Sequence, residues 1–133
     1  LTNKAFPFIR YDIGDLAYSN DYDGTFIKTL NGLEGKAKDI ILDTKSNRIG
    51  NVSFAAYFEL FMQIKKYQLI QEDTKSYKIK IELKESMTID AKELIKIFKG
   101  CLGQDAKIEV MIVDKIETTG AGKYCPVVSN LKR

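Results

Sequence analysis

The 133-residue sequence contains no histidine. Ser-His-Asp and Cys-His nucleophile systems are therefore excluded within this chain, as are metal centres with imidazole ligands. Cysteine is also scarce, because Cys101 and Cys125 form neither a CxxC pair nor a disulfide framework. We interpret both thiols as reduced and structural, which favours the cytoplasm as the compartment. Any catalytic group must then be a Lys, Arg, Asp, Glu, Tyr, Ser or Thr side chain, or the backbone.

Long apolar runs and an excess of one charge are missing too. No run approaches the roughly 18 residues of a membrane span, and residues 1–15 lack the apolar core of a signal peptide. The 21 basic and 18 acidic residues leave a net charge of +3, so charge gives little support for a nucleic-acid partner. A composition of 44% hydrophobic and 29% charged residues predicts a soluble globular protein.

The first part of the chain reads as short strands and turns without helical periodicity. "FPFIRY" (6–11) and "TFIKTL" (25–30) are strand candidates, and the polar turn "SNDYDG" (19–24) separates them. This part has too few apolar residues for a core of its own. We therefore expect it to pack against something else.

The second part begins with a predicted strand at 39–42 and a polar hairpin at 44–47. A helix with Asn51 or Ser53 as its N-cap is predicted to follow. Aromatic side chains recur there at i, i+3, i+4 and i+7, which favours a core stripe over a ligand-binding aromatic box: Phe54, Tyr57, Phe58 and Phe61.

Two strands are predicted next, at 67–71 and 77–83, and the second alternates apolar residues with Lys and Glu. Asp90 and Glu93 form a capping pair for a second helix, which Gly100 or Gly103 ends. A last strand is predicted at 107–113. The order strand, helix, strand, strand, helix, strand predicts an α+β, ferredoxin-like split βαβ domain, an antiparallel sheet with two helices on one face.

Polar residues and glycines cluster in three segments where the core pattern stops: "RYDIGD" (10–15), "EGKAKD" (34–39) and "TTGAGK" (118–123). Taken singly, they are compatible with a closed turn, a solvated hairpin and a flexible C-terminal loop. The third is not a phosphate-binding P-loop, because the upstream glycine is missing, Tyr124 replaces the required Ser or Thr, and no helix follows.

Together these motifs resemble the C-terminal part of the adenylate-forming (acyl- and aryl-CoA synthetase) superfamily. The closest likeness is to its phenylacetate-CoA ligase branch, which includes CapK-like proteins found with capsular polysaccharide genes. The likeness rests on "PFIRYDIGDLA", "GKAKDII", "NRIGNVSF" and "IETTGAGKYCPVV", which occur in the family's order and cover essentially the whole chain. It implies that residues 1–35 end a large adenylation domain and that residues 36–133 form the small C-terminal lid domain.

The resemblance implies a role for each matching residue. Asp15 would accept hydrogen bonds from the ribose hydroxyls of ATP or AMP, since a carboxylate offers two acceptor oxygens to a diol. Lys36 would also reach the nucleotide, although the family usually has an arginine there. Lys38 occupies the hinge position, and Lys123 matches the lysine of the adenylation step.

Arg10 and Arg48 would be supporting contacts, and no metal ligand is implied within this chain. The family's reaction joins a carboxylate to ATP and then passes the acyl group to a thiol, normally CoA, with Mg²⁺ as cofactor. The expected partners are the protein's own N-terminal domain and a small carboxylic acid, and a homodimer is compatible with the sequence. We expect neither ligase activity from this fragment alone nor a membrane span.

The alternative is a stand-alone ferredoxin-like module with a regulatory or dimerising role and no catalysis. The fold class alone permits it, because such folds host many functions. An upstream reading frame with a Ser/Thr/Gly-rich phosphate loop would favour the ligase, and a start codon near Leu1 would favour the module.

Overall fold

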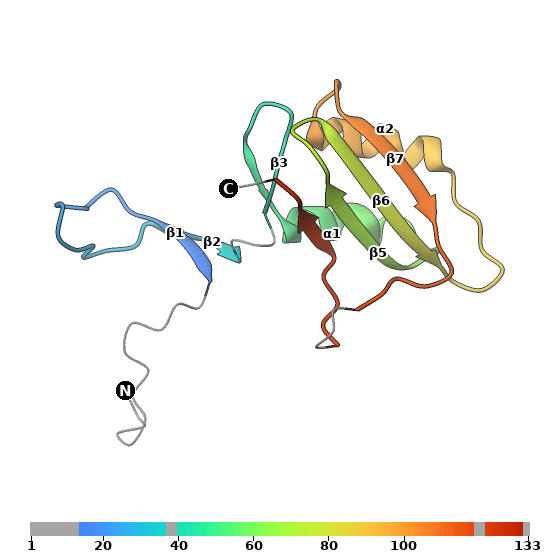
Figure 1. Cartoon of the computed structure of the whole chain (residues 1–133), viewed down its shortest axis with the longest axis horizontal. Helices are drawn as coiled ribbons and strands as arrows, with labels where there is room; N and C mark the ends of the chain where they lie inside the picture. The colour runs from blue at the N-terminus through green and yellow to red at the C-terminus, as the bar shows by residue number, and fades with distance from the viewer. Residues whose placement is uncertain (1–13, 37–39, 119–121, 132–133) are drawn as a thin grey trace, which may run out of the picture. The chain divides into compact units, whose positions relative to one another are not determined.

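The computed structural model describes residues 14–36, 40–118 and 122–131 (Figure 1). The chain divides into two compact units, Leu1–Ala37 and Lys38–Arg133. The assignment of the first unit to a larger adenylation domain stays a prediction.

A hairpin forms the described part of the first unit. Strands β1 (Asp15–Tyr18) and β2 (Gly32–Lys36) pair antiparallel, with a register shift between Leu16 and Ala17. The strand predicted at 25–30 was wrong. Asp23 Oδ1 accepts hydrogen bonds from the Thr25 and Phe26 amides at 2.9 and 3.1 Å, and this Asx turn keeps the segment in the loop. The candidate strand at 6–11 lies outside the described residues.

The second unit opens with a small hairpin and a helix. β3 (Ile40–Leu42) pairs antiparallel with β4 (Arg48–Gly50), and α1 (Asn51–Glu59) follows directly. The predicted N-cap was wrong, because Gly50 caps α1 and no side chain bonds to the helix start. Asn51 is instead the first helical residue, and its buried Oδ1 lacks a hydrogen-bond partner among the described residues.

A four-stranded sheet forms the centre of this unit, in the order β7-β6-β5-β8 (Figure 1). Its strands are β5 (Ile64–Gln71), β6 (Ser76–Leu83), β7 (Lys107–Ile112) and β8 (Val127–Ser129). The α+β class is confirmed. The sheet is mixed rather than purely antiparallel, because α2 (Ala91–Leu102) crosses over between β6 and β7 and leaves them parallel. β8 adds a second parallel pair, with β5.

The capping signals of α2 are found at both ends. Asp90 Oδ1 accepts a hydrogen bond from the Lys92 amide at 2.8 Å, and Glu93 lies in the first turn. Gly103, not Gly100, caps the C-terminus. Both helices cover the same face of the sheet (Figure 1), and the rings of Phe58 and Phe98 meet with centroids 4.7 Å apart.

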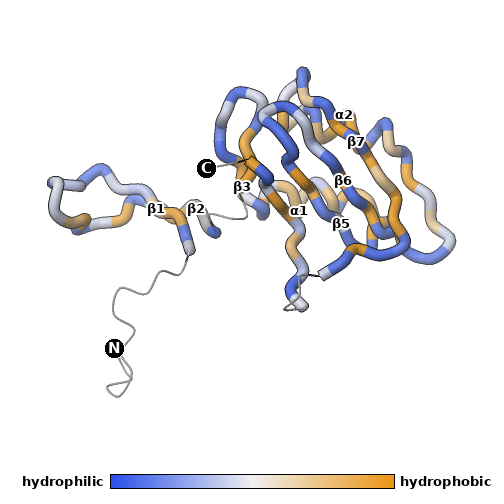
Figure 2. Tube along the Cα trace, in the orientation of Figure 1, coloured by the Kyte–Doolittle hydropathy of each residue, from blue (hydrophilic) through white to orange (hydrophobic). Residues whose placement is uncertain are grey.

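The core lies between this face and the two helices. Along β6, hydrophobic and hydrophilic residues alternate (Figure 2), and the apolar set points inward as the sequence predicts. Burial of each such side chain stabilises the fold by about 1.5–3 kcal/mol. The most deeply buried side chains are Ile41, Phe54, Leu69, Tyr77, Ile79, Ile81, Leu94, Phe98 and Leu102.

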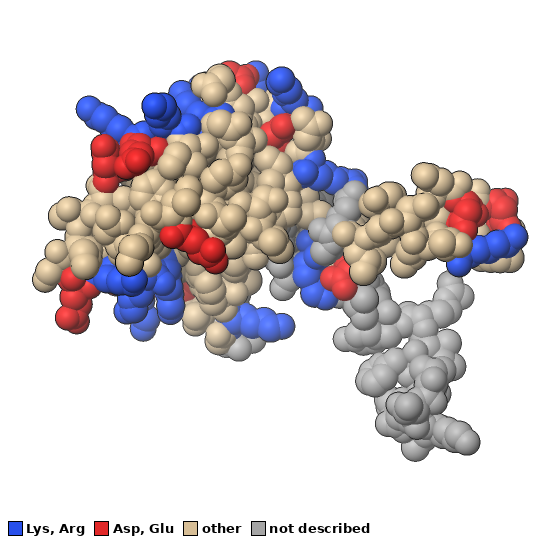
Figure 3. All heavy atoms as spheres, turned by 180° about the vertical axis from the view of Figure 1, so that it is seen from behind, with Lys and Arg blue, Asp and Glu red and all other residues tan. Residues whose placement is uncertain are grey.

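The surface carries charges of both signs. Lysine and arginine side chains alternate with acidic ones over the face shown in Figure 3. Among the described residues, no helix is long and apolar enough to cross a bilayer, and no cluster of three His, Cys, Asp or Glu side chains could hold a metal ion.

Candidate functional site

The hairpin of the first unit brings two of the predicted nucleotide contacts together. Asp15 lies opposite Lys36 in the β1–β2 register. Lys36 Nζ lies 2.9 Å from Asp15 Oδ1, and the side chains of Lys36 and Asp15 remain 46% and 29% exposed. The lysine therefore pairs with the carboxylate that is predicted to bind ribose, and it can orient that carboxylate directly.

The other predicted residues lie either in the second unit or outside the described residues. Arg48 is exposed at the start of β4, opposite Leu42. Lys123 is exposed in the segment that precedes β8. Arg10 and the predicted hinge residue Lys38 lie outside the described residues.

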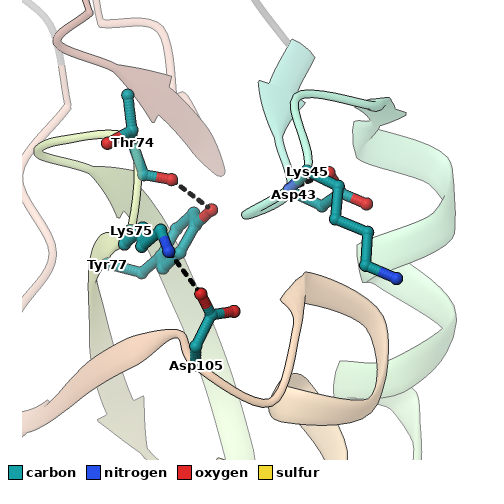
Figure 4. Close-up of polar contacts among 6 residues, drawn as sticks. All are labelled: Asp43, Lys45, Thr74, Lys75, Tyr77 and Asp105. Carbon is teal, nitrogen blue, oxygen red and sulfur yellow. Dashed lines mark hydrogen bonds and ion pairs between the residues drawn. The ribbon is translucent and has the colours of Figure 1, made fainter.

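Strand β3, which follows the predicted hinge residue Lys38, is hydrogen-bonded to side chains of the central sheet. The buried amide of Gln71 accepts a hydrogen bond from Leu42 N and donates one to Leu42 O, both at 3.0 Å. The Tyr77 hydroxyl donates its one hydrogen to Leu42 O at 2.7 Å, and Thr74 O is a second, longer acceptor at 3.3 Å, which Figure 4 shows. Burial raises the pKa of Tyr77 to about 12. Leu42 of β3 is thereby hydrogen-bonded to side chains of both β5 and β6.

A polar cluster at the end of α2 completes this anchor (Figure 4). Lys75 Nζ lies 2.5 Å from Asp105 Oδ2. This hydrogen bond, with a second from Thr44, lowers the pKa of Asp105 to about 2. Asp43 closes the β3–β4 turn by accepting from the Lys45 and Asn47 amides at 2.8 Å, and the side chain of Asn47 is the main cause of the lowered pKa of Asp43.

The segment carrying Lys123 begins beside a buried carboxylate. After β7 the chain runs past the end of β6 and the start of β5 towards β8 (Figure 1). Glu82 is only 4% exposed. Its Oε1 lies 2.8 Å from Lys65 Nζ, and its Oε2 accepts from the amide of Ile116 at 3.0 Å. The bond from Lys65, followed by the one from Ile116, lowers the pKa of Glu82.

The segment also ends on the sheet. The hydroxyl of Tyr124, the residue after Lys123, accepts from Tyr67 N at 3.1 Å and donates to Tyr67 O. Burial raises the pKa of Tyr124. Next along the chain, Cys125 O accepts from Gln68 Nε2 at 3.0 Å, and Pro126 O accepts from Leu69 N at 2.8 Å.

Glu82 and Tyr124 were not predicted as functional residues. Glu82 belongs to the polar side of an alternating strand, a pattern that indicates a solvated face. Tyr124 stood out only as the residue that breaks a P-loop motif. No local signal shows that the first is buried or that the second bonds to a distant strand.

Both cysteines lie among the described residues. Neither forms a disulfide. Burial raises the pKa of the Cys101 thiol to about 11, so this thiol stays protonated and unreactive at neutral pH.

Comparisons with known proteins identify the family and the fold of the chain. The model of the CapK C-terminal domain family matches residues 41–130. The chain is similar to a domain of phenylacetate-coenzyme A ligase from Bacteroides vulgatus ATCC 8482, with 15% identity and a TM-score of 0.51 over 72% of this chain and 96% of that domain. A search of curated proteins found no significant match.

A second solved structure, apo MatB from Rhodopseudomonas palustris, matches with 15% identity and a TM-score of 0.55. The match covers 84% of this chain and only 22% of MatB, so the chain spans a small part of that protein. At such identities the structures show a shared fold. The family match spans most of the chain and confirms the resemblance seen in the motifs: the chain belongs to the CapK C-terminal domain family.

Proposed function

We propose that this chain is the C-terminal domain of an AMP-forming ligase that activates a carboxylic acid with ATP and transfers the acyl group to a thiol such as CoA. The observation that carries the proposal is the family match over residues 41–130. We extend it to a cytoplasmic enzyme linked to capsular polysaccharide biosynthesis, whose large N-terminal domain is the partner of this chain.

Lys123 has the central role in this proposal. The nucleophile of the first step is the substrate carboxylate, which is ionised at neutral pH and needs no general base. It attacks the α-phosphorus of ATP, and pyrophosphate leaves with the electrons of the broken P–O bond. The Lys123 ammonium stabilises the negative charge that develops on the α-phosphate, as a preorganised cation does in a transition state. Gly122, at φ +73°, sets the direction of the backbone just before it.

Asp15 and Lys36 serve the nucleotide in the same scheme. Asp15 accepts hydrogen bonds from the ribose hydroxyls. The 2.9 Å ion pair supports a role for Lys36 in orienting that carboxylate. Arg10 and Arg48 are supporting contacts.

We assign the switch between the two half-reactions to rotation at Lys38. The bonds of Gln71 and Tyr77 to Leu42 support this assignment, because they make β3 move with the rest of the second unit. Mg²⁺ belongs to the parent enzyme in this proposal, and we assign its binding mainly to the large N-terminal domain.

The test is Lys123→Ala in the enzyme that contains this chain. We expect pyrophosphate release to fall by about 10²–10³, because one transition-state charge contact is lost. Transfer to CoA from a supplied acyl-adenylate should stay near the wild-type rate, because rotation at Lys38 moves Lys123 away from the nucleotide.

Lys84→Ala is the matched control, because Lys84 is an exposed lysine in another loop of the same unit. It should leave both half-reactions unchanged. Equal loss of both half-reactions in Lys123→Ala, or wild-type rates in both, would contradict the assigned role.

A further inference from the structure

Among the described residues, Glu82 is the one charged side chain that is buried. Each of its oxygens has a specific partner, one on Lys65 at 2.8 Å and the other on the Ile116 amide at 3.0 Å. Lys65 is itself 59% exposed, so it neutralises the carboxylate from the solvent side. The inner oxygen holds the backbone of the segment that leads to Lys123, and Ile116 is only 2% exposed there.

Tyr124 makes the corresponding contact after Lys123. The parallel pairing of β5 with β8 begins at Leu69 and Val127, so the main chain of Tyr67 lies just before it. The Tyr124 hydroxyl bonds to both the N–H and the carbonyl of Tyr67 and thereby takes the place of a strand partner. Tyr67 is held in turn, because its ring stacks on Phe58 with centroids 3.6 Å apart.

We propose that Glu82 and Tyr124 are positioning residues that hold the two ends of the segment from Ile116 to Tyr124, which carries Lys123. Glu82 holds the first end by accepting from the Ile116 amide, and Tyr124 holds the second by bonding to the main chain of Tyr67. Fixing both ends limits the volume that the lysine amine samples, which is the means by which positioning groups accelerate a reaction. The consequence for catalysis rests on the proposed function, whereas the structural part can be tested without it.

The first experiment follows the backbone amides of the whole chain by NMR. Glu82→Met removes both acceptor oxygens at similar length, so exchange of the Ile116 amide should accelerate by about tenfold or more. Tyr124→Phe removes only the hydroxyl and should accelerate exchange of the Tyr67 amide. Both variants should lower the order parameter of the Lys123 amide.

Two controls separate the hydrogen bond from the charge and from general destabilisation. Glu82→Gln keeps one acceptor oxygen for Ile116, so the order of the Lys123 amide should return towards the wild-type value. Glu109→Met makes the same change as Glu82→Met on the same sheet face, at a site 66% exposed, and should leave the Lys123 amide unchanged. An unchanged Lys123 amide in both Glu82→Met and Tyr124→Phe would overturn the proposal.

The second experiment is a double-mutant cycle in the enzyme that contains this chain. Tyr124→Phe should lower adenylation by about tenfold in the wild-type background and have no further effect in the Lys123→Ala background, since it acts through Lys123. Equal losses in both backgrounds would overturn the positioning role. If Lys123→Ala alone leaves adenylation unchanged, the proposed function of Lys123 fails, and the NMR result still decides whether the segment is held at both ends.

Discussion

Gly103 shows how a single residue sets the geometry of the second unit. It ends α2 with φ +118°, and a Cβ built on it would lie 2.0 Å from Thr44 Oγ1. The close approach lets the Thr44 amide donate to Leu102 O at 2.8 Å, which joins the β3–β4 hairpin to the end of the helix. Only glycine fits both the backbone angle and the available space.

Gly103→Ala should therefore lower the free energy of unfolding by about 1–3 kcal/mol, from backbone strain and the clash with Thr44. The matched control is Gly100→Ala, three residues earlier on the exposed side of α2, where nothing lies within 4 Å of an added Cβ. It should stabilise the protein by about 0.5–1 kcal/mol. Urea unfolding measures both changes, and two shifts of the same sign would contradict this account.

Asp105 links stability to pH. Hydrogen bonds from Lys75 and Thr44 lower its pKa to about 2, below the value of about 3.9 in an unfolded chain. A depressed folded-state pKa stabilises the protein above the unfolded pKa, and this contribution is lost as the pH falls from about 4 towards about 2. Asp105→Asn should thus flatten the acid side of a plot of urea midpoint against pH. The control Asp114→Asn, at an exposed site, should keep the wild-type slope.

At the scale of elements, β3 is held to the sheet by side chains instead of a strand ladder. It pairs only with β4 among the described strands. The amide of Gln71 substitutes for a neighbouring strand by bonding to both the N–H and the carbonyl of Leu42. The attachment of β3, next to the predicted hinge, to β5 thus depends on the fully buried side chain of Gln71.

Gln71→Met should accordingly destabilise the second unit by about 1–3 kcal/mol, because the Leu42 amide is left buried without its acceptor. The Leu42 carbonyl keeps the hydroxyl of Tyr77. Amide exchange at Leu42 should accelerate together with the loss of stability in urea. Gln63→Met, a partly exposed glutamine just before β5, serves as the control and should change neither quantity.

For the whole molecule, the two described units carry different parts of the predicted machinery. Asp15 and Lys36 lie in the first unit, and Arg48 and Lys123 lie in the second. The first unit consists, in its described part, of one hairpin with several exposed large apolar side chains. Such side chains favour burial against another domain.

We therefore expect residues 1–133 alone to bind ATP weakly and to lack ligase activity. The hydrogen bonds of a single carboxylate to ribose contribute on the order of 1–3 kcal/mol, which does not exceed the cost of about 4 kcal/mol or more for immobilising a ligand. Titration calorimetry should show no binding in the micromolar range. Micromolar binding that Asp15→Asn abolishes would refute this expectation.

The sequence by itself determined the parts of the fold that depend on local periodicity. The aromatic spacing in α1 and the alternation along β6 report which side of an element is apolar. The Asp90 cap marks where α2 begins. The ordered motifs also indicated the family. The strand predicted at 25–30 failed because the Asx turn at Asp23 uses the amides of Thr25 and Phe26, a local preference that apolar content does not reveal.

Only the tertiary structure decided which distant groups meet. Alternation along β6 places Glu82 on the polar face of the strand. Whether Glu82 is exposed to solvent there depends on the path of residues 113–118, which are far along the chain. The same holds for the Tyr124 hydroxyl on Tyr67 and the parallel addition of β8. Each is a contact between segments far apart in the sequence, so no local pattern encodes it.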